Sequence, residues 1–444
     1  MIKAQHIDIA RAVRKSVGAE NLIFHASAFW RWRDRGVWTR IEDREVQLEI
    51  HAVLDLGGFA ANFGRGTIDS AMDLLRTECY RPEHRFDPQR VAVNTISANV
   101  TWAEDLKSWS LQSHRREDYQ TVQVPVGYDP AARCPKFLDF LADIFRGDAD
   151  AADKALVIAE MMGYSLLTSC QFEKFILLIG GGANGKTVLL KVIEALVGPA
   201  MVCAVQPSQL DNKFQRAHLA GKLVNIVTEI AEGAEIADAQ LKAIVSGELT
   251  TAEHKHRDPF DFHPFATCWF ATNHMPHTRD FSEAMFRRAI VIPFNNRFDG
   301  PECDPNLIEK LKTELPGILT LALGAVRGVI LRGAFTDSAS SNAAKREWQL
   351  NCDQAAQYFD ERCERRPGAQ VGSTTLYQDY RDWANEQGVN RVLTQKNLIQ
   401  RLVNRYGLTT SRTNAGRYVD GAEFRSGVGQ NVVNLADRRS YRDA

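Results

Sequence analysis

The stretch that decides the fold runs from Phe175 to Thr187 and reads FILLIGGGANGKT. Residues 175–179 are all apolar, as is typical of a strand buried on both faces of a parallel sheet. The residues that follow fit the pattern G-x-x-x-x-G-K-[ST] and are Gly180, Gly181, Gly182, Ala183, Asn184, Gly185, Lys186 and Thr187. A helix is expected over 187–197, because Gly198 and Pro199 end it.

A strand, a glycine-rich loop and a helix in this order predict a site for nucleotide phosphates. Glycines let backbone N–H groups wrap around phosphate oxygens, and the N-terminus of the following helix carries a positive partial charge. Lys186 is expected to reach the β- and γ-phosphates, and the hydroxyl of Thr187 is expected to bind Mg²⁺. The alternative is a glycine turn that binds no nucleotide, but such a turn does not require this strand and this helix around it.

Working outward, the apolar segments 223–227, 265–271 and 289–294 predict further strands of the same sheet. Helical patterns alternate with them, starting with a helix from about 154 to 168. Residues 151–337 are therefore predicted to form an α/β domain with a parallel-type core sheet.

The residues up to 150 are predicted to form a small α+β domain. Alternating aromatic and basic residues around a turn predict a β-hairpin over 29–38, a strand pattern returns at 122–126, and a helix is expected over 136–145. The hairpin tryptophans are Trp30, Trp32 and Trp38. They could stack on nucleic-acid bases, but packing within the hairpin also explains their alternation and is the preferred interpretation.

Residues 338–425 are predicted to form a winged-helix-like module, and 426–444 a flexible tail. Helices expected over 374–385 and 394–406 precede a wing that ends near Val419. Between Gly388 and Val419 there is no acidic residue, and the basic ones are Arg391, Lys396, Arg401, Arg405, Arg412 and Arg417. This pattern is typical of a duplex-DNA binder; the alternative is a packing module with a solvated basic face.

The composition limits which partners and which cellular compartment are expected. The 444 residues include 54 basic and 55 acidic side chains, for a formal net charge of −1, so any nucleic acid must be bound through local basic patches. The eight cysteines form no C-x-x-C pair, which favours reduced thiols over a zinc ribbon or a disulfide framework. The longest apolar run, 318–331, is interrupted by glycine and arginine, and no signal sequence is evident, so a soluble cytoplasmic protein without a membrane span is expected.

Polar residues follow two of the predicted strands. Glu229 is a candidate for polarising an attacking water or for holding Mg²⁺ through water, although Thr228 stands where an aspartate is usual. Glu232 is a second acid nearby. Asn273 could sense the γ-phosphate and position water, and an Asx turn with His274 is the other interpretation.

Two basic segments lie in the same domain. Residues 249–262 have strand-like ends and a charged middle, which predicts a β-hairpin whose tip carries the phosphate-contacting residues His254, Lys255 and His256. A solvated charged loop is equally compatible with that pattern. Arg287 and Arg288 precede the last strand, where an arginine could act as a finger inserted in trans; an exposed arginine pair is the alternative.

The order of these elements resembles the superfamily 3 helicases, an AAA+ class found mostly in viruses, phages and plasmids. The closest resemblance is to the helicase half of phage and satellite-phage primase–helicases, which are related to the poxvirus primase–helicase. Besides the loop, Glu229, the hairpin, Asn273 and the arginine pair, the matching stretches are GKLV at 221–224, LKAIVSG at 241–247, FDFHP at 260–264, TNHMP at 272–276 and residues 288–294.

The resemblance implies a ring, in this family usually a hexamer, that moves along single-stranded DNA by hydrolysing ATP with Mg²⁺. It places Lys255 and His256 in the central channel and takes the finger from the neighbouring subunit, with Arg288 as the first choice and Arg287 as the alternate. Residues 1–150 correspond to a collar-like domain. Since residues 1–90 are too few for a primase domain, a separate primase is a candidate partner.

The sequence thus predicts an ATP-driven DNA helicase of phage or plasmid replication in the bacterial cytoplasm. Its C-terminal module is expected to contact duplex or forked DNA through Lys396, Arg401 and Arg405. The alternative is an ATP-switched initiator or origin-binding protein with weak or no processive unwinding. A third class is a nucleotide-dependent interaction protein whose ATP turnover does not respond to single-stranded DNA.

Overall fold

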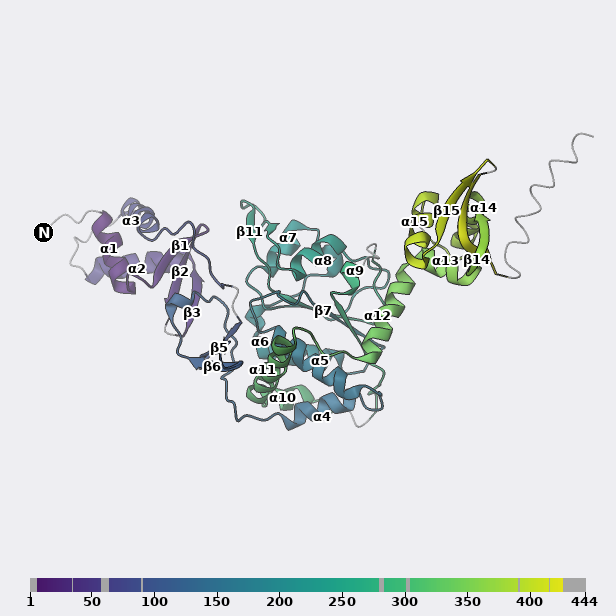
Figure 1. Cartoon of the computed structure of the whole chain (residues 1–444). Coiled ribbons are helices and arrows are strands. Elements are labelled where there is room, and N and C mark those ends of the chain that lie inside the picture. Colours follow the sequence, from purple (N-terminus) through teal and green to yellow (C-terminus); the bar gives the residue numbers. More distant parts are fainter. Residues whose placement is uncertain are drawn as a thin grey trace, which may run out of the picture. The chain divides into compact units, whose positions relative to one another are not determined.

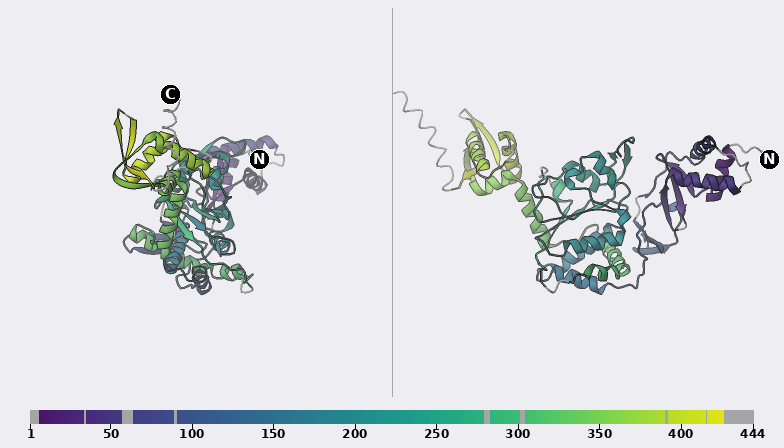
Figure 2. Two further views of the ribbon diagram at one scale, coloured as in Figure 1. Left: turned by 90° about the vertical axis from the view of Figure 1, so that its right-hand side faces the viewer. Right: turned by 180° about the vertical axis from the view of Figure 1, so that it is seen from behind.

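The computed structural model describes most of the chain as two compact units, residues 1–344 and 345–444 (Figures 1 and 2). The described ranges are 6–33, 35–56, 64–88, 91–278, 283–300, 304–389, 392–414 and 416–425. The predicted flexible tail at 426–444 and Arg391 lie outside them.

The first unit is built around a five-stranded parallel sheet with the strand order β13-β7-β12-β9-β8. The strands are β7 (Phe175–Ile179), β8 (Val202–Cys203), β9 (Val224–Val227), β12 (Thr267–Thr272) and β13 (Ala289–Pro293). The four predicted strands are therefore confirmed to within about two residues. Of these five strands, β8 alone was not predicted, because a strand of two residues carries no periodic pattern.

Helices cover both faces of this sheet (Figure 1). On one side lie α4 (Pro135–Ile144), α5 (Ala151–Tyr164), α6 (Lys186–Val197), α10 (Leu307–Lys312) and α11 (Leu315–Arg332). On the other lie α7 (Lys213–Arg216), α8 (Asp238–Val245) and α9 (Glu283–Phe286), with the hairpin of β10 (Thr250–Ala252) and β11 (Phe260–Phe262). Because both faces are covered, every residue of β12 is buried.

Helix α11 is apolar and, at 18 residues, long enough to cross a membrane by length and composition. No apolar run of this length was predicted from the sequence. In the structure α11 is a core helix, since Ile318, Leu319 and Val326 are fully buried and the helix packs closely on α5. The close approach occurs at Gly163 of α5, where a Cβ would lie 2.2 Å from the carbonyl oxygen of Ala322.

The N-terminal part of the first unit contains two small antiparallel sheets. The elements are α1 (His6–Val17), β1 (Leu22–His25), β2 (Ala28–Arg33), β3 (Val37–Ile41), α2 (Asp43–Leu56), α3 (Arg65–Glu78), β4 (Ala92–Asn94), β5 (Asn99–Ala103) and β6 (Ser108–Gln112). The predicted hairpin is the β2–β3 pair. The strand predicted at 122–126 is wrong: the segment makes only an isolated bridge between Thr95 and Val124, and Pro125 has no N–H to extend it.

The hairpin tryptophans are placed by packing. Trp38 is 1% exposed, and its indole Nε1 donates to the carbonyl oxygen of Arg116 at 2.9 Å. Trp30 packs on Phe86 with ring centroids 4.4 Å apart, and Trp32 lies 6.0 Å from Trp38. The packing interpretation therefore accounts for these rings.

The second unit is a small α+β module that the chain reaches through α12 (Ala339–Cys352). Its elements are α13 (Gln354–Arg362), β14 (Cys363–Gly372), α14 (Ser373–Glu386), α15 (Gln395–Tyr406), β15 (Thr409–Thr413) and β16 (Gly416–Phe424). Both predicted helices are present, and a β15–β16 hairpin follows them. Strand β14 was not predicted, although it pairs with β16 to complete a three-stranded sheet.

Replacing Gly163 by alanine tests the α5–α11 contact. We expect Gly163→Ala to lower the free energy of unfolding by about 1–3 kcal/mol, because the added methyl group clashes with the backbone of α11, which cannot move aside easily. The matched control is Gly324→Ala in α11, where a Cβ would meet nothing within 4 Å. The control should be neutral or stabilising by up to about 1 kcal/mol. Equal denaturation midpoints for the two variants would contradict the packing described here.

Candidate nucleotide-binding site

The glycine-rich loop joins the end of β7 to the start of α6, as the sequence predicts. Gly185 has φ 90°, and a Cβ there would lie 2.6 Å from Cγ2 of Ile144. At Gly180 a Cβ would lie 2.4 Å from the carbonyl oxygen of Phe294. Gly181 and Gly182 face open space instead. Gly180 and Gly185 are therefore required where the loop packs against neighbouring segments. Gly181 and Gly182 leave the outer side of the loop open to a ligand.

Lys186 lies inside the loop rather than in solvent. Its Nζ donates to the carbonyl oxygens of Gly180 at 2.5 Å and Gly181 at 3.1 Å and to Oδ1 of Asn184 at 3.1 Å. Burial lowers the pKa of Lys186, and the nearby carboxylate of Glu229 opposes that shift. Thr187, the next residue, is exposed in the first turn of α6. An ammonium group and a hydroxyl at a helix N-terminus suit a polyphosphate with its metal ion.

Glu229 and Asn273 meet at the carboxyl edge of the sheet. Glu229 follows β9 and Asn273 follows β12, and the two strands are parallel neighbours. Both residues are exposed, and Nδ2 of Asn273 donates to Oε1 of Glu229 at 3.2 Å. The amide therefore restrains the orientation of the carboxylate, and Glu229 is close enough to the loop to affect the pKa of Lys186. Glu232, the second acid, is also exposed.

Three residues that support the loop were not predicted. The backbone N–H of Phe298 donates to the carbonyl oxygen of Ala183 at 2.6 Å. Asn295 donates to Asp148 at 2.9 Å, and Asn296 donates to backbone carbonyls of 143–146. The segment after β13 therefore ties the loop to the turn that follows α4. An Asn-Asn pair after a strand was the only signal in the sequence, and it is compatible with any turn.

Arg288 and Arg287 have different environments. The Arg288 side chain is 11% exposed and pairs with Glu173 at 2.6 Å, while its Nη atoms donate to the carbonyl oxygen of Ala284 and to Oγ of Ser246. The Arg287 side chain is 63% exposed and lies 4.0 Å from Glu173. An arginine that acts on another subunit must be free to reach it. Arg287 is therefore the more accessible of the two side chains, and the assignment of a finger to either arginine stays a prediction.

The predicted hairpin is confirmed, with its charged residues in the connection between β10 and β11. Lys255 and His256 are exposed, and His256 has φ 62°, typical of a tight turn. His254 instead stacks on Phe260 with ring centroids 5.1 Å apart, and partial desolvation together with nearby cations such as Arg257 lowers the pKa of its imidazole. His254 thus supports the hairpin, and the tip cations are Lys255 and the adjacent, exposed Arg257, which the prediction left out.

In the second unit the candidate DNA residues divide into two groups. Lys396 is exposed in the first turn of α15. Arg401 and Arg405 pair with Asp353 at 3.9 and 3.3 Å, and Asp353 is 5% exposed and caps α13. These two arginines therefore join α15 to α13. A role for them in binding DNA competes with that structural role.

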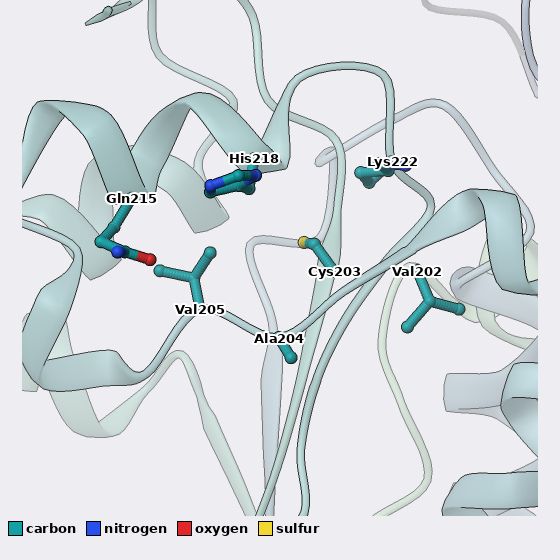
Figure 3. A pocket seen from close by; sticks show the side chains of 7 residues that line it. All are labelled: Val202, Cys203, Ala204, Val205, Gln215, His218 and Lys222. Atoms are coloured by element: carbon teal, nitrogen blue, oxygen red, sulfur yellow. The ribbon is translucent and has the colours of Figure 1, made fainter. Parts of the chain in front are cut away.

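A separate cavity of about 340 Å³ lies beside β8 (Figure 3). Its lining residues are Val202, Cys203, Ala204, Val205, Gln215, His218 and Lys222. None of them belongs to the glycine-rich loop. Across the described ranges, no group of three or more histidine, cysteine or acidic side chains could hold a metal ion by itself. A Mg²⁺ ion at Thr187 and Glu229 would therefore depend on water and phosphate oxygens for its remaining ligands, as is usual for this ion.

Two families of sequences match parts of the chain. Residues 10–146 match the family described as D5 N terminal like. Residues 178–288 match a family of unknown function (DUF5906). The second match includes most of the glycine-rich site, the hairpin and both arginines.

Viral proteins named as helicases are similar to about half of the chain. "Putative helicase 184R" of Invertebrate iridescent virus 6 is 25% identical over 235 residues, which are 48% of this chain and 23% of that protein. "Putative helicase L207/L206" of Acanthamoeba polyphaga mimivirus is 23% identical over 265 residues, which are 53% of this chain and 28% of that protein. The chain matches only about a quarter of the length of these relatives.

Solved structures of the NrS-1 C-terminal region share the fold. One apo structure has a TM-score of 0.51 at 13% identity and covers 92% of this chain and 97% of that one. Another has a TM-score of 0.52 at 12% identity and covers 93% and 98%. The mixed α/β architecture is thus shared with the NrS-1 region.

The two arginines are distinguished by a stability measurement. We expect Arg288→Ala to lower the free energy of unfolding by about 1–3 kcal/mol, because buried groups lose a charged hydrogen-bond donor. Arg287→Ala should stay within about 0.5 kcal/mol of the parent chain, as is usual for an exposed residue. Chemical denaturation of both variants decides the point, and equal destabilisation would refute the assignment of Arg288 to an internal brace.

Proposed function

We propose that this chain is an ATP-driven DNA helicase of the superfamily 3 type, an AAA+ protein that works as a ring, most simply a hexamer, on single-stranded DNA. The observation that carries the proposal is the convergence of the glycine-rich loop, Glu229 and Asn273 at one edge of a parallel sheet. Such an edge is where open α/β sheets bind ligands. The helicase names of the viral relatives support the same activity.

Each group at this edge has a role in hydrolysis. The backbone of 180–185 and Lys186 bind the ATP phosphates, and Thr187, with Glu229 acting through water, would hold Mg²⁺. When bound there, Mg²⁺ would supply positive charge that neutralises the phosphates. Glu229 orients the attacking water and accepts its proton, while Asn273 fixes the carboxylate through the 3.2 Å hydrogen bond.

Arg287 supplies the finger to a neighbouring protomer. The carbonyl oxygen of Arg288 accepts from the N–H of Phe175 at 3.0 Å, so this arginine pair lies at the start of β7, whereas the glycine-rich loop follows the end of β7. A strand of this length separates the two edges by roughly 13 Å at about 3.3 Å per residue. That separation keeps Arg287 away from its own loop, which favours action in trans.

The DNA contacts are assigned to two places. Lys255, His256 and Arg257 at the β10–β11 tip contact the single strand in the channel, where copies from several protomers converge. The second unit, proposed as a winged-helix-like module built from α14, α15 and the β15–β16 hairpin, contacts duplex or forked DNA through Lys396. A separate primase is a candidate partner.

Removing the lysine of the loop tests the proposed activity. We expect the parent chain to hydrolyse ATP faster with single-stranded DNA and to unwind a forked duplex that has no origin sequence. Lys186→Ala should abolish both activities, because the phosphates lose their charged partner, and it should leave the circular dichroism spectrum unchanged. The matched control is Lys191→Ala, an exposed lysine on the same helix.

The control variant should retain full activity. ATP turnover that ignores single-stranded DNA in the parent chain would favour a nucleotide-dependent interaction protein. Turnover without unwinding of the forked duplex would favour an initiator. If Lys186→Ala hydrolyses ATP at the parent rate, the assignment of the glycine-rich loop as the nucleotide site is wrong.

A further inference from the structure

The segment between β8 and β9 connects the proposed hydrolysis site with the proposed DNA hairpin. We propose that Arg216 in this segment is a positioning residue that clamps the β10–β11 hairpin and so sets how tightly DNA is coupled to ATP turnover. The effect on DNA coupling rests on the proposed function. The contacts of Arg216 with the hairpin all lie within the first unit and do not depend on that function.

The hairpin needs external support. Only three residue pairs join β10 to β11, and the connection 254–259 is exposed throughout. An isolated two-stranded hairpin of this size is marginally stable in water. One internal contact, from the Thr251 hydroxyl to Asp261 at 2.6 Å, adds to the pairing. Something outside the hairpin must therefore hold it in a fixed position.

Arg216 provides that support through its whole guanidinium group. Nε and Nη2 both donate to the carbonyl oxygen of Thr251 in β10, at 3.0 and 2.7 Å. Nη1 donates to the carbonyl oxygen of Leu210 at 2.9 Å and more weakly to that of Asp211 at 3.4 Å. The planar fork thus joins β10 to the turn before α7. Lysine cannot reproduce these directions, because its ammonium group is a single point of charge.

The short helix that carries Arg216 is itself fixed. Asn212 caps it, accepting from the backbone N–H groups of Phe214 at 2.9 Å and Gln215 at 3.4 Å. Lys213 pairs with Glu253, and the N–H of Glu253 donates to the carbonyl oxygen of Lys213 at 3.2 Å. The clamp is therefore part of a small rigid patch that includes α7 and the start of the hairpin connection.

The other end of the same segment contacts the hydrolysis site. Nε2 of Gln206 donates to the carbonyl oxygen of Glu229 at 3.1 Å. Asn225 of β9 exchanges two hydrogen bonds with the backbone of Val205, at 2.7 and 2.9 Å. The segment is thus anchored beside Glu229 at residues 205–206 and to the hairpin at Arg216. Loss of the clamp loosens the hairpin, which then keeps the Lys213–Glu253 contacts to α7, and leaves the anchors near Glu229 in place.

A hairpin that is less firmly held should bind DNA more weakly. The tip residues Lys255, His256 and Arg257 would have to be ordered by the DNA itself, which weakens binding by the entropy of that ordering. The hydrolysis residues keep their own contacts. Variants of Arg216 should therefore raise the DNA concentration needed for stimulation and leave basal hydrolysis nearly unchanged.

The first measurement is hydrogen exchange at the amides of 250–262 in the full chain, without nucleotide or DNA. Arg216→Ala should speed exchange in this peptide by roughly tenfold, given the loss of hydrogen bonds to a charged donor. The control is Gln215→Ala, whose side chain lines the cavity beside β8 (Figure 3) and should leave the rate unchanged. Unchanged exchange in Arg216→Ala would overturn the clamp.

The second measurement is ATP hydrolysis against the concentration of single-stranded DNA. Arg216→Ala should raise the half-saturating concentration roughly tenfold, with basal turnover within about twofold of the parent. Arg216→Lys should behave like the alanine variant; full recovery by lysine would show a charge effect and contradict positioning. An equal fall in basal turnover would make Arg216 a general structural residue and also overturn the proposal.

The two failures are distinguishable. If the parent chain shows no stimulation by DNA, the proposed function fails, and the exchange measurement still decides whether Arg216 clamps the hairpin.

Discussion

Parallel pairing of β7, β12 and β9 brings three separate parts of the sequence to one edge of the sheet. The glycine-rich loop, Asn273 and Glu229 each follow one of these strands, and the strand order places them side by side. Burial of apolar side chains on both faces fixes the strands, so the position of the edge depends on the whole core. The 3.2 Å bond between Asn273 and Glu229 is a direct result of that pairing.

The arginine pair lies at the opposite end of the strands, beside the start of β7. Arg287 lies there, while its neighbour Arg288 is held by Glu173 and Ser246. One arginine thus braces the strand entrance, and the other remains available to a second protomer. In the proposed ring, Arg287 would complete the nucleotide site of the next copy, because the two lie at opposite ends of the strands.

The sequence predicted the sheet well because buried parallel strands are continuous apolar runs. It missed β8, which has only two residues, and wrongly placed a strand at 122–126, where apolar residues alternate but only Val124 forms a bridge. The contacts that individual side chains make were harder to predict. Nothing in the pattern separates Arg287 from Arg288, or shows that Arg401 and Arg405 pair with Asp353, because those contacts join residues that are distant in sequence or on different elements.

The central claim is that two protomers share each nucleotide site, and mixing two inactive variants tests it most directly. Glu229→Gln removes the acid and Arg287→Ala removes the finger, so a mixed ring contains some interfaces in which both groups are intact. The account predicts that the mixture hydrolyses ATP several-fold faster than the mean of the two separate variants, in the presence of single-stranded DNA. A mixture no more active than that mean, with subunit exchange verified by mass measurement, would contradict it.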